Sequence, residues 1–162
     1  MAYTKHTYKG KYIPTNPQKY CGDVTKIVYR SSYEVRFMRW CDINSNVLQW
    51  GSEEVVIPYR SPMDNLMHRY FVDFFVKVKS KNGVVKKYLV EVKPLRYTQE
   101  PVMPKRKTQH FLAEVMQWGI NQAKWDAARK FAVTTGCEFL LVTEHDLGLL
   151  IIPMEPFHYH HK

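Results

Sequence analysis

Two segments, residues 71–78 and 84–93, constrain the fold of this chain more than any other part of its sequence. Nearly every even-numbered position in both is apolar, which predicts two β-strands that carry their apolar side chains on a shared face. The residues between them include Ser80, Asn82 and Gly83, which favour a tight turn. The sequence therefore predicts an antiparallel hairpin.

The register of this hairpin follows from its apolar face. A two-residue turn would set the apolar face of one strand beside the other face of its partner, so the pattern disfavours it. A three-residue loop over 81–83, with Gly83 in the left-handed conformation, pairs Ser80 with Val84. In that register Asp73 lies directly opposite Glu91, with Cβ atoms about 5 Å apart, and Lys93 shares their face.

Two carboxylates held opposite each other repel unless a cation lies between them. Carboxylate oxygens suit Mg²⁺ or Mn²⁺, so a metal site is one interpretation of the pair. The alternative is a solvated polar face on which Lys77, Lys87 and Lys93 neutralise the acids. The spacing alone leaves both interpretations open.

The remaining segments predict helices on either side of further strands. This order favours the α/β class, with a central mixed β-sheet flanked by helices. The expected elements are a helix over 31–41 that ends at 44–46, strands over 47–50 and 55–57, a loop over 58–66, a helix over 108–134 that ends at Gly136, a strand over 138–143 and an apolar segment over 147–152.

The length and charge of the chain indicate one basic domain. Its 162 residues fit a single domain, and 24 Lys and Arg against 15 Asp and Glu give a net charge of +9, which favours an acidic partner such as DNA. We expect a basic and aromatic arm over 1–25, the domain over 26–155 and a His-rich tail over 156–162. The arm lies either on a partner or on its own core.

Cysteine usage and hydropathy narrow the class of protein further. The three cysteines are far apart and odd in number, so neither a disulfide framework nor a zinc knuckle is supported, and a reducing compartment is expected. No segment approaches the roughly 20 apolar residues of a membrane span, so no membrane partner is expected.

One short motif connects the hairpin to a known superfamily. Asp73, followed by Glu91-Val92-Lys93, resembles the PD-(D/E)xK signature of restriction-endonuclease-like nucleases, although Val72 stands where proline is common. Glu34 lies on the preceding predicted helix, where many members place another metal-directed acid. Ser31-x-x-Glu34 is also a capping box, in which the acid only closes the helix start.

Three longer blocks, 22–31, 50–62 and 68–74, resemble the head-completion nucleases of T-even-type tailed bacteriophages, and TnsA-type transposon endonucleases are similar in their core. The resemblance implies a restriction-endonuclease-like sandwich and a DNA endonuclease of phage head completion. It also implies phage head, portal or neck proteins as partners and a place in the host cell cytoplasm or the virion. No base-reading motif is visible, so we expect recognition of DNA ends or branched structures rather than of sequence.

The resemblance also assigns roles to individual residues. Glu34, Asp73 and Glu91 would hold one or two Mg²⁺ or Mn²⁺ ions, and Lys93 would position or polarise the attacking water. Five cationic residues are candidates for phosphate contacts: Arg30, Arg69, Lys105, Arg106 and Lys107.

Two rival functions use the same sequence. One is a non-enzymatic head or neck protein that binds DNA on a nuclease-like fold, which needs no metal. The other is an endonuclease of the Holliday-junction or transposon type with no role in the capsid. Head assembly with Glu91→Ala and Lys93→Ala variants distinguishes the first rival from a nuclease, because these variants spare assembly only if no cleavage is needed. Cleavage of branched DNA distinguishes the second rival.

Overall fold

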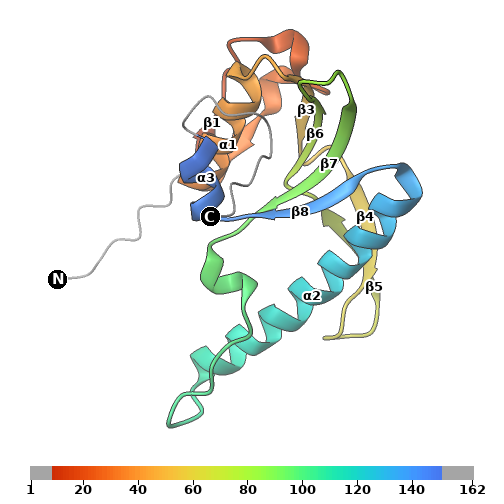
Figure 1. Cartoon of the computed structure of the whole chain (residues 1–162). Helices are drawn as coiled ribbons and strands as arrows, with labels where there is room; N and C mark the ends of the chain where they lie inside the picture. Colours follow the sequence, from red (N-terminus) through yellow and green to blue (C-terminus); the bar gives the residue numbers. More distant parts are fainter. Residues whose placement is uncertain (1–8, 151–162) are drawn as a thin grey trace, which may run out of the picture.

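The computed structural model describes residues 9–150, which form a four-stranded sheet with helices on both faces (Figure 1). The strand order is β3 (Val47–Ser52), β6 (Phe74–Lys79), β7 (Val85–Val92) and β8 (Glu138–Val142). Strand β6 is antiparallel to both β3 and β7, and β8 runs parallel to β7. The predicted central mixed sheet is therefore confirmed.

The hairpin of β6 and β7 has the predicted register. Phe74 pairs with Val90 and Val76 with Tyr88. The Ser80 N–H donates to the Val84 carbonyl at 2.9 Å, and Gly83 has a φ of 82°, so the three-residue loop is confirmed.

The first strand of this hairpin is shorter than predicted, because the segment 71–78 belongs to two strands. Phe71 ends β5 (Met67–Phe71), which pairs with β4 (Val56–Arg60), and the chain changes direction at Val72 and Asp73 before β6 begins. The Val72 N–H donates to the Val55 carbonyl in the neighbouring sheet. The prediction of one continuous strand was wrong because apolar alternation shows which face is buried but not which strand forms the hydrogen bonds.

Two other boundaries also differ from the predictions. Pro58, Tyr59 and Arg60 belong to β4 rather than to a loop, because this two-stranded sheet leaves β4 without a further neighbour and so tolerates a proline. The apolar segment predicted over 147–152 falls partly within α3 (Glu144–Leu150), and its remainder lies outside the described residues.

The two long helices begin and end where their capping residues predict. Ser31 caps α1 (Ser32–Ile43), and its hydroxyl accepts from the Glu34 N–H. Thr108 caps α2 (Gln109–Thr135), which ends at Gly136 with a φ of 70°, a conformation that glycine adopts without strain. Helix α2 is long, but no helix within residues 9–150 is apolar enough over sufficient length to cross a membrane.

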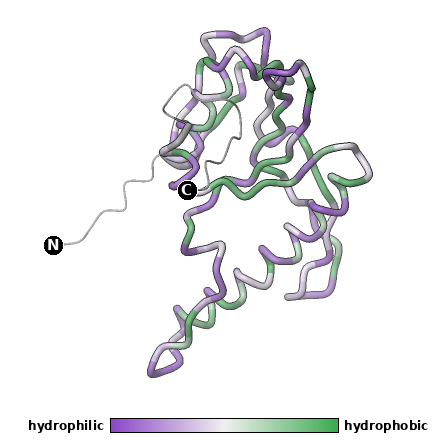
Figure 2. Tube along the Cα trace, in the orientation of Figure 1, coloured by the Kyte–Doolittle hydropathy of each residue, from purple (hydrophilic) through white to green (hydrophobic). Residues whose placement is uncertain are grey.

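The sheet separates two apolar cores. On the face formed by the even-numbered residues of β6, side chains of α1 and α3 pack against Trp50, Phe74 and Val76. On the other face, Trp125 and its neighbours on α2 pack together with the β4–β5 hairpin. Figure 2 shows the hydrophobic colouring concentrated on the central strands between these layers.

The described part of the N-terminal segment lies on the domain itself. Strand β1 (Gly10–Lys11) pairs with β2 (Val28–Tyr29), and buried Asp42 on α1 accepts hydrogen bonds from Tyr12 Oη at 2.8 Å and the Thr15 N–H at 2.7 Å. Residues 1–8 and the His-rich tail over 156–162 lie outside the described residues. Three short 3₁₀ helices complete the fold: η1 (Pro17–Lys19), η2 (Val24–Lys26) and η3 (Leu95–Thr98).

Candidate active site

Asp73 lies at the bend between β5 and β6, where its side chain turns toward β7. Its Oδ2 accepts from the Val92 N–H at 2.9 Å, which takes the place of a further rung of the β6–β7 ladder. Within residues 9–150, Oδ1 accepts no hydrogen bond. Burial, followed by the nearby Glu91 carboxylate, raises the pKa of Asp73 well above its usual value.

Glu91 is buried near the end of β7 and is held at both carboxylate oxygens. The Tyr70 hydroxyl donates to Oε2 at 2.5 Å, and Lys93 Nζ donates to Oε1 at 3.3 Å. Asp73, Glu91 and Lys93, which the sequence predicts to share a site, are therefore neighbours in the fold.

Tyr70 is a member of this cluster that the sequence analysis missed. It is 3% exposed on β5, and burial followed by the Glu91 charge raises its pKa. Lys124 on α2 lies above the same ring, with Nζ 5.5 Å from the ring centroid. Nothing in the sequence pairs Tyr70 with Glu91, because the contact joins two different sheets.

Glu34 lies in the first turn of α1 and near the other acids. Its Oε2 accepts from the Arg30 N–H at 2.7 Å, and its N–H donates to Ser31 Oγ at 3.1 Å. Burial raises the pKa of Glu34, and the neighbouring Glu53 and Glu91 carboxylates contribute in the same direction. The Ser31 half of the predicted capping box is formed, but the Glu34 carboxylate accepts from the Arg30 N–H rather than from the Ser31 N–H that would complete it. Glu34 Oε1 accepts no hydrogen bond within the described residues.

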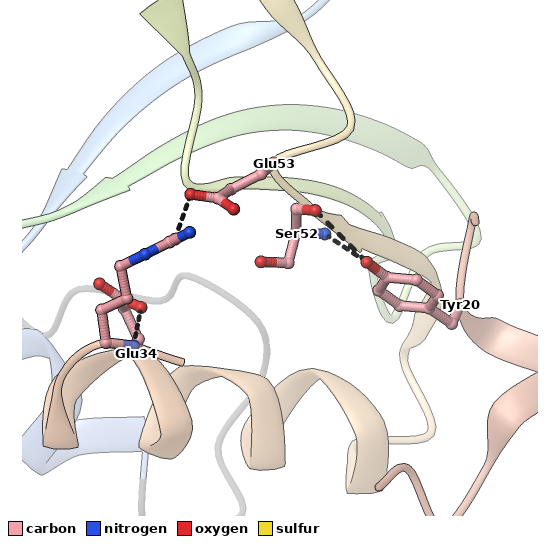
Figure 3. Close-up of polar contacts among 5 residues, drawn as sticks. Tyr20, Glu34, Ser52 and Glu53 are labelled. Atoms are coloured by element: carbon pink, nitrogen blue, oxygen red, sulfur yellow. Dashed lines mark hydrogen bonds and ion pairs between the residues drawn. The ribbon is translucent and has the colours of Figure 1, made fainter. Parts of the chain in front are cut away.

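Glu53 is a second residue that the sequence analysis missed. It follows the end of β3, and its carboxylate forms an ion pair with Arg30 Nη1, so Arg30 lies between Glu53 and Glu34. Figure 3 labels these two acids and marks both contacts with dashed lines. The Glu53 N–H donates to the Asp73 carbonyl at 3.1 Å. The only sequence signal is the Glu53-Glu54 pair, which does not indicate which of the two acids faces the site.

The cationic residues predicted to contact phosphate are not gathered in one place. Arg30 lies among the acids, whereas Arg69 lies exposed on β5 with its guanidinium carbon 5.1 Å from the centre of the Phe71 ring. Lys105, Arg106 and Lys107 are exposed in the segment before α2, at the end of that helix remote from β8 (Figure 1).

The donor chemistry of this cluster suits a hard cation. One carboxylate oxygen of Asp73 and one of Glu34 accept no hydrogen bond from the described residues, and the neighbouring acids repel one another in the absence of a cation. However, no group of three or more His, Cys, Asp or Glu side chains in the described part of the chain converges closely enough to hold one metal ion. The three-acid metal site therefore stays a prediction.

Comparison with known proteins gives two matches. Residues 44–144 match the family model described as TnsA-like endonuclease N terminal. Over 147 residues the chain is 39% identical to the head completion nuclease of Enterobacteria phage T4, an alignment that covers 88% of this chain and 95% of that protein. No solved structure matches.

Proposed function

The chain belongs to the family of TnsA-like endonucleases, and on this premise we propose that it is a metal-dependent DNA endonuclease of phage head completion. One observation carries the proposal. Asp73 and Glu91 lie together at adjoining strand ends, with Lys93 Nζ 3.3 Å from a Glu91 oxygen. This arrangement supports the role that the PD-(D/E)xK resemblance implies for these residues.

Asp73, Glu91 and Glu34 are the residues that would hold Mg²⁺ or Mn²⁺. When bound, such an ion lowers the pKa of a water molecule and neutralises charge on the scissile phosphate. Hydrogen bonds already fix two of these carboxylates: the Val92 N–H donates to one oxygen of Asp73, and the Tyr70 hydroxyl donates to one oxygen of Glu91. Fixed ligands reduce the entropy that is lost when an ion and a phosphate are ordered together.

Lys93 supplies a cation next to the carboxylates. Its side chain is 29% exposed, so the ammonium group is accessible from outside while remaining within reach of Glu91. We assign it the positioning of the attacking water and the stabilisation of negative charge on the phosphate during cleavage. An ammonium group in this place costs little reorganisation because Glu91 already orients it.

The proposed substrate is DNA that is recognised by its ends or branches. Exposed cationic side chains such as Arg69 and Lys105 contact phosphates without reading bases, which gives affinity without sequence preference. The proposed partners are head, portal or neck proteins of a phage, and the proposed location is the host cell cytoplasm or the virion. A DNA-binding head or neck protein without activity is the alternative.

The test is cleavage of linear, supercoiled and branched DNA by the wild type in Mg²⁺, in Mn²⁺ and in a chelator. We expect cleavage only with metal, and its loss in Asp73→Asn. Asp64→Asn is the control, because Asp64 is an exposed turn residue that contacts His68. DNA binding without cleavage of any form would instead favour the non-enzymatic head protein.

A further inference from the structure

Glu53 has a backbone conformation that glutamate rarely adopts. Its φ is 56°, and Asn65 is the one other non-glycine residue with positive φ in the described part of the chain. Asparagine tolerates this region, whereas glutamate gains nothing locally from it, so the surrounding structure must hold the Glu53 backbone in place.

Contacts on both sides hold this strained residue. The Glu53 N–H donates to the Asp73 carbonyl at 3.1 Å, and the preceding residue, Ser52, is bound through its backbone to the Tyr20 hydroxyl at 3.2 and 3.3 Å (Figure 3). The same bend therefore fixes the backbones of Glu53 and Asp73. Strain that is maintained in this way beside a candidate active site suggests that the direction of the Glu53 side chain matters.

The Glu53 carboxylate is directed at Arg30. The two side chains form an ion pair, and the Arg30 backbone N–H donates to Glu34 Oε2 at 2.7 Å. The Arg30 side chain is nevertheless 52% exposed, and Glu53 contacts only Nη1, so the guanidinium has further N–H donors to offer to a ligand. A guanidinium held in one orientation with free donors is suited to a phosphate oxygen.

We propose that Glu53 is a positioning residue, which holds Arg30 at the edge of the acidic cluster so that the guanidinium binds a DNA phosphate next to the cleaved bond. This inference rests on the proposed nuclease function. It adds a role for Glu53 and restricts the role of Arg30, which binds a phosphate at the site itself rather than at a distance. It also explains why a glutamate is kept in a strained conformation.

The experiment is a double-mutant cycle with Arg30→Ala, Glu53→Ala and the double variant, measured as kcat/KM for DNA cleavage. Alanine at residue 53 experiences a similar backbone strain at positive φ, so the comparison isolates the side chain. We expect each single variant to lose about tenfold and the double variant to lose no more than Arg30→Ala alone, as for groups that act together. Glu53→Gln keeps an oxygen that accepts from Arg30, so we expect it to restore part of the loss.

Measurements of DNA affinity in the absence of metal separate this inference from the proposed function. In a chelator, Glu53→Ala should weaken binding of duplex DNA as much as Arg30→Ala does, although it removes a negative charge near the DNA. Glu138→Gln is the matched control, since Glu138 is an exposed acid paired with a surface lysine, Lys86. We expect Glu138→Gln to leave the affinity for duplex DNA unchanged.

The outcomes are distinct. Additive losses in the double variant, equal effects of Gln and Ala at residue 53, or tighter DNA binding by Glu53→Ala would overturn the positioning role. The same cycle can be measured as DNA affinity in a chelator. If the wild type cuts no DNA but the losses of DNA affinity in the single and double variants are non-additive, the nuclease proposal fails and the positioning of Arg30 for phosphate stands. If the wild type cuts and the cycle is additive, only the positioning role fails.

Discussion

The acidic cluster and the basic segment before α2 (Gln109–Thr135) differ in how firmly they are held. Asp73 and Glu91 are fixed by hydrogen bonds from Val92 and Tyr70. Lys105–Lys107 are exposed, and no hydrogen bond or ion pair within residues 9–150 restrains their side chains. Cleavage of a bond needs a fixed geometry, whereas binding of the DNA backbone needs only positive charge, so this difference fits the roles proposed for the two regions.

The largest effect is expected from removing a carboxylate of the acidic cluster. Asp73→Asn removes a carboxylate charge but keeps the side-chain shape, and it should lower the cleavage rate by about 10³-fold or more, which corresponds to several kcal/mol of transition-state stabilisation. Single-turnover kinetics measures this loss. DNA binding in a chelator should be unchanged or tighter, and a rate within tenfold of wild type would remove Asp73 from the site.

A smaller loss is expected when only the support of a ligand is removed. Tyr70→Phe keeps the buried ring but deletes the hydroxyl that holds Glu91 Oε2. We expect about 10–100-fold weaker Mn²⁺ binding or activity, as is usual for groups that orient metal ligands. Calorimetric titration with Mn²⁺ and cleavage kinetics measure both.

Tyr59→Phe is the control for Tyr70→Phe. Tyr59 lies on the neighbouring strand β4 (Val56–Arg60) beneath the same Lys124 ammonium group, and it makes no hydrogen bond to the acids in the described part of the chain. An equal loss in both variants would indicate a general effect on the β4–β5 hairpin rather than on Glu91.

The basic segment should show the opposite pattern. Replacing Lys105, Arg106 and Lys107 with alanine should lower the slope of log affinity against log salt by about 0.9 for each phosphate contact that is lost, with kcat unchanged. Fluorescence anisotropy at several salt concentrations measures the slope. A variant that lacks Lys79, Lys86 and Lys87 loses the same charge elsewhere, and an equal change in both would show that only net charge matters.

The smallest effect is expected at the cap of α1 (Ser32–Ile43). Ser31→Ala removes the acceptor for the Glu34 N–H and should cost about 1 kcal/mol of folding free energy. Urea denaturation measures it. Cleavage should fall less than in Asp73→Asn, because the Arg30 N–H still holds Glu34; a complete loss would mean that the cap alone positions this acid.

Local patterns were sufficient where a turn or capping residue marks the contact that sets the element. The apolar face of the β6–β7 hairpin and the glycine in its loop predicted the register in which Phe74 pairs with Val90. Ser31, Thr108 and Gly136 predicted the helix ends. In each case the determining contact spans only a few residues, so the sequence displays both members of it together.

Contacts that the apolar pattern does not reveal decided the parts that the sequence did not predict. Phe71 pairs with Val56 on β4, so one strand, β5 (Met67–Phe71), ends before the next, β6 (Phe74–Lys79), begins, although the apolar pattern continues through both. Alternation reports which face is buried, but it does not report which strand forms the hydrogen bonds.

The amino-acid pattern alone predicts the hairpin that places Asp73 beside Glu91, the capped helix that carries Glu34, and the family to which they point. The folded chain adds that Tyr70 supports Glu91 and that Glu53 rather than Glu54 holds Arg30. The physical reason is that a side-chain contact between separate sheets or loops depends on backbone direction at a bend. That direction is set by packing across the whole fold, as the positive φ of Glu53 shows.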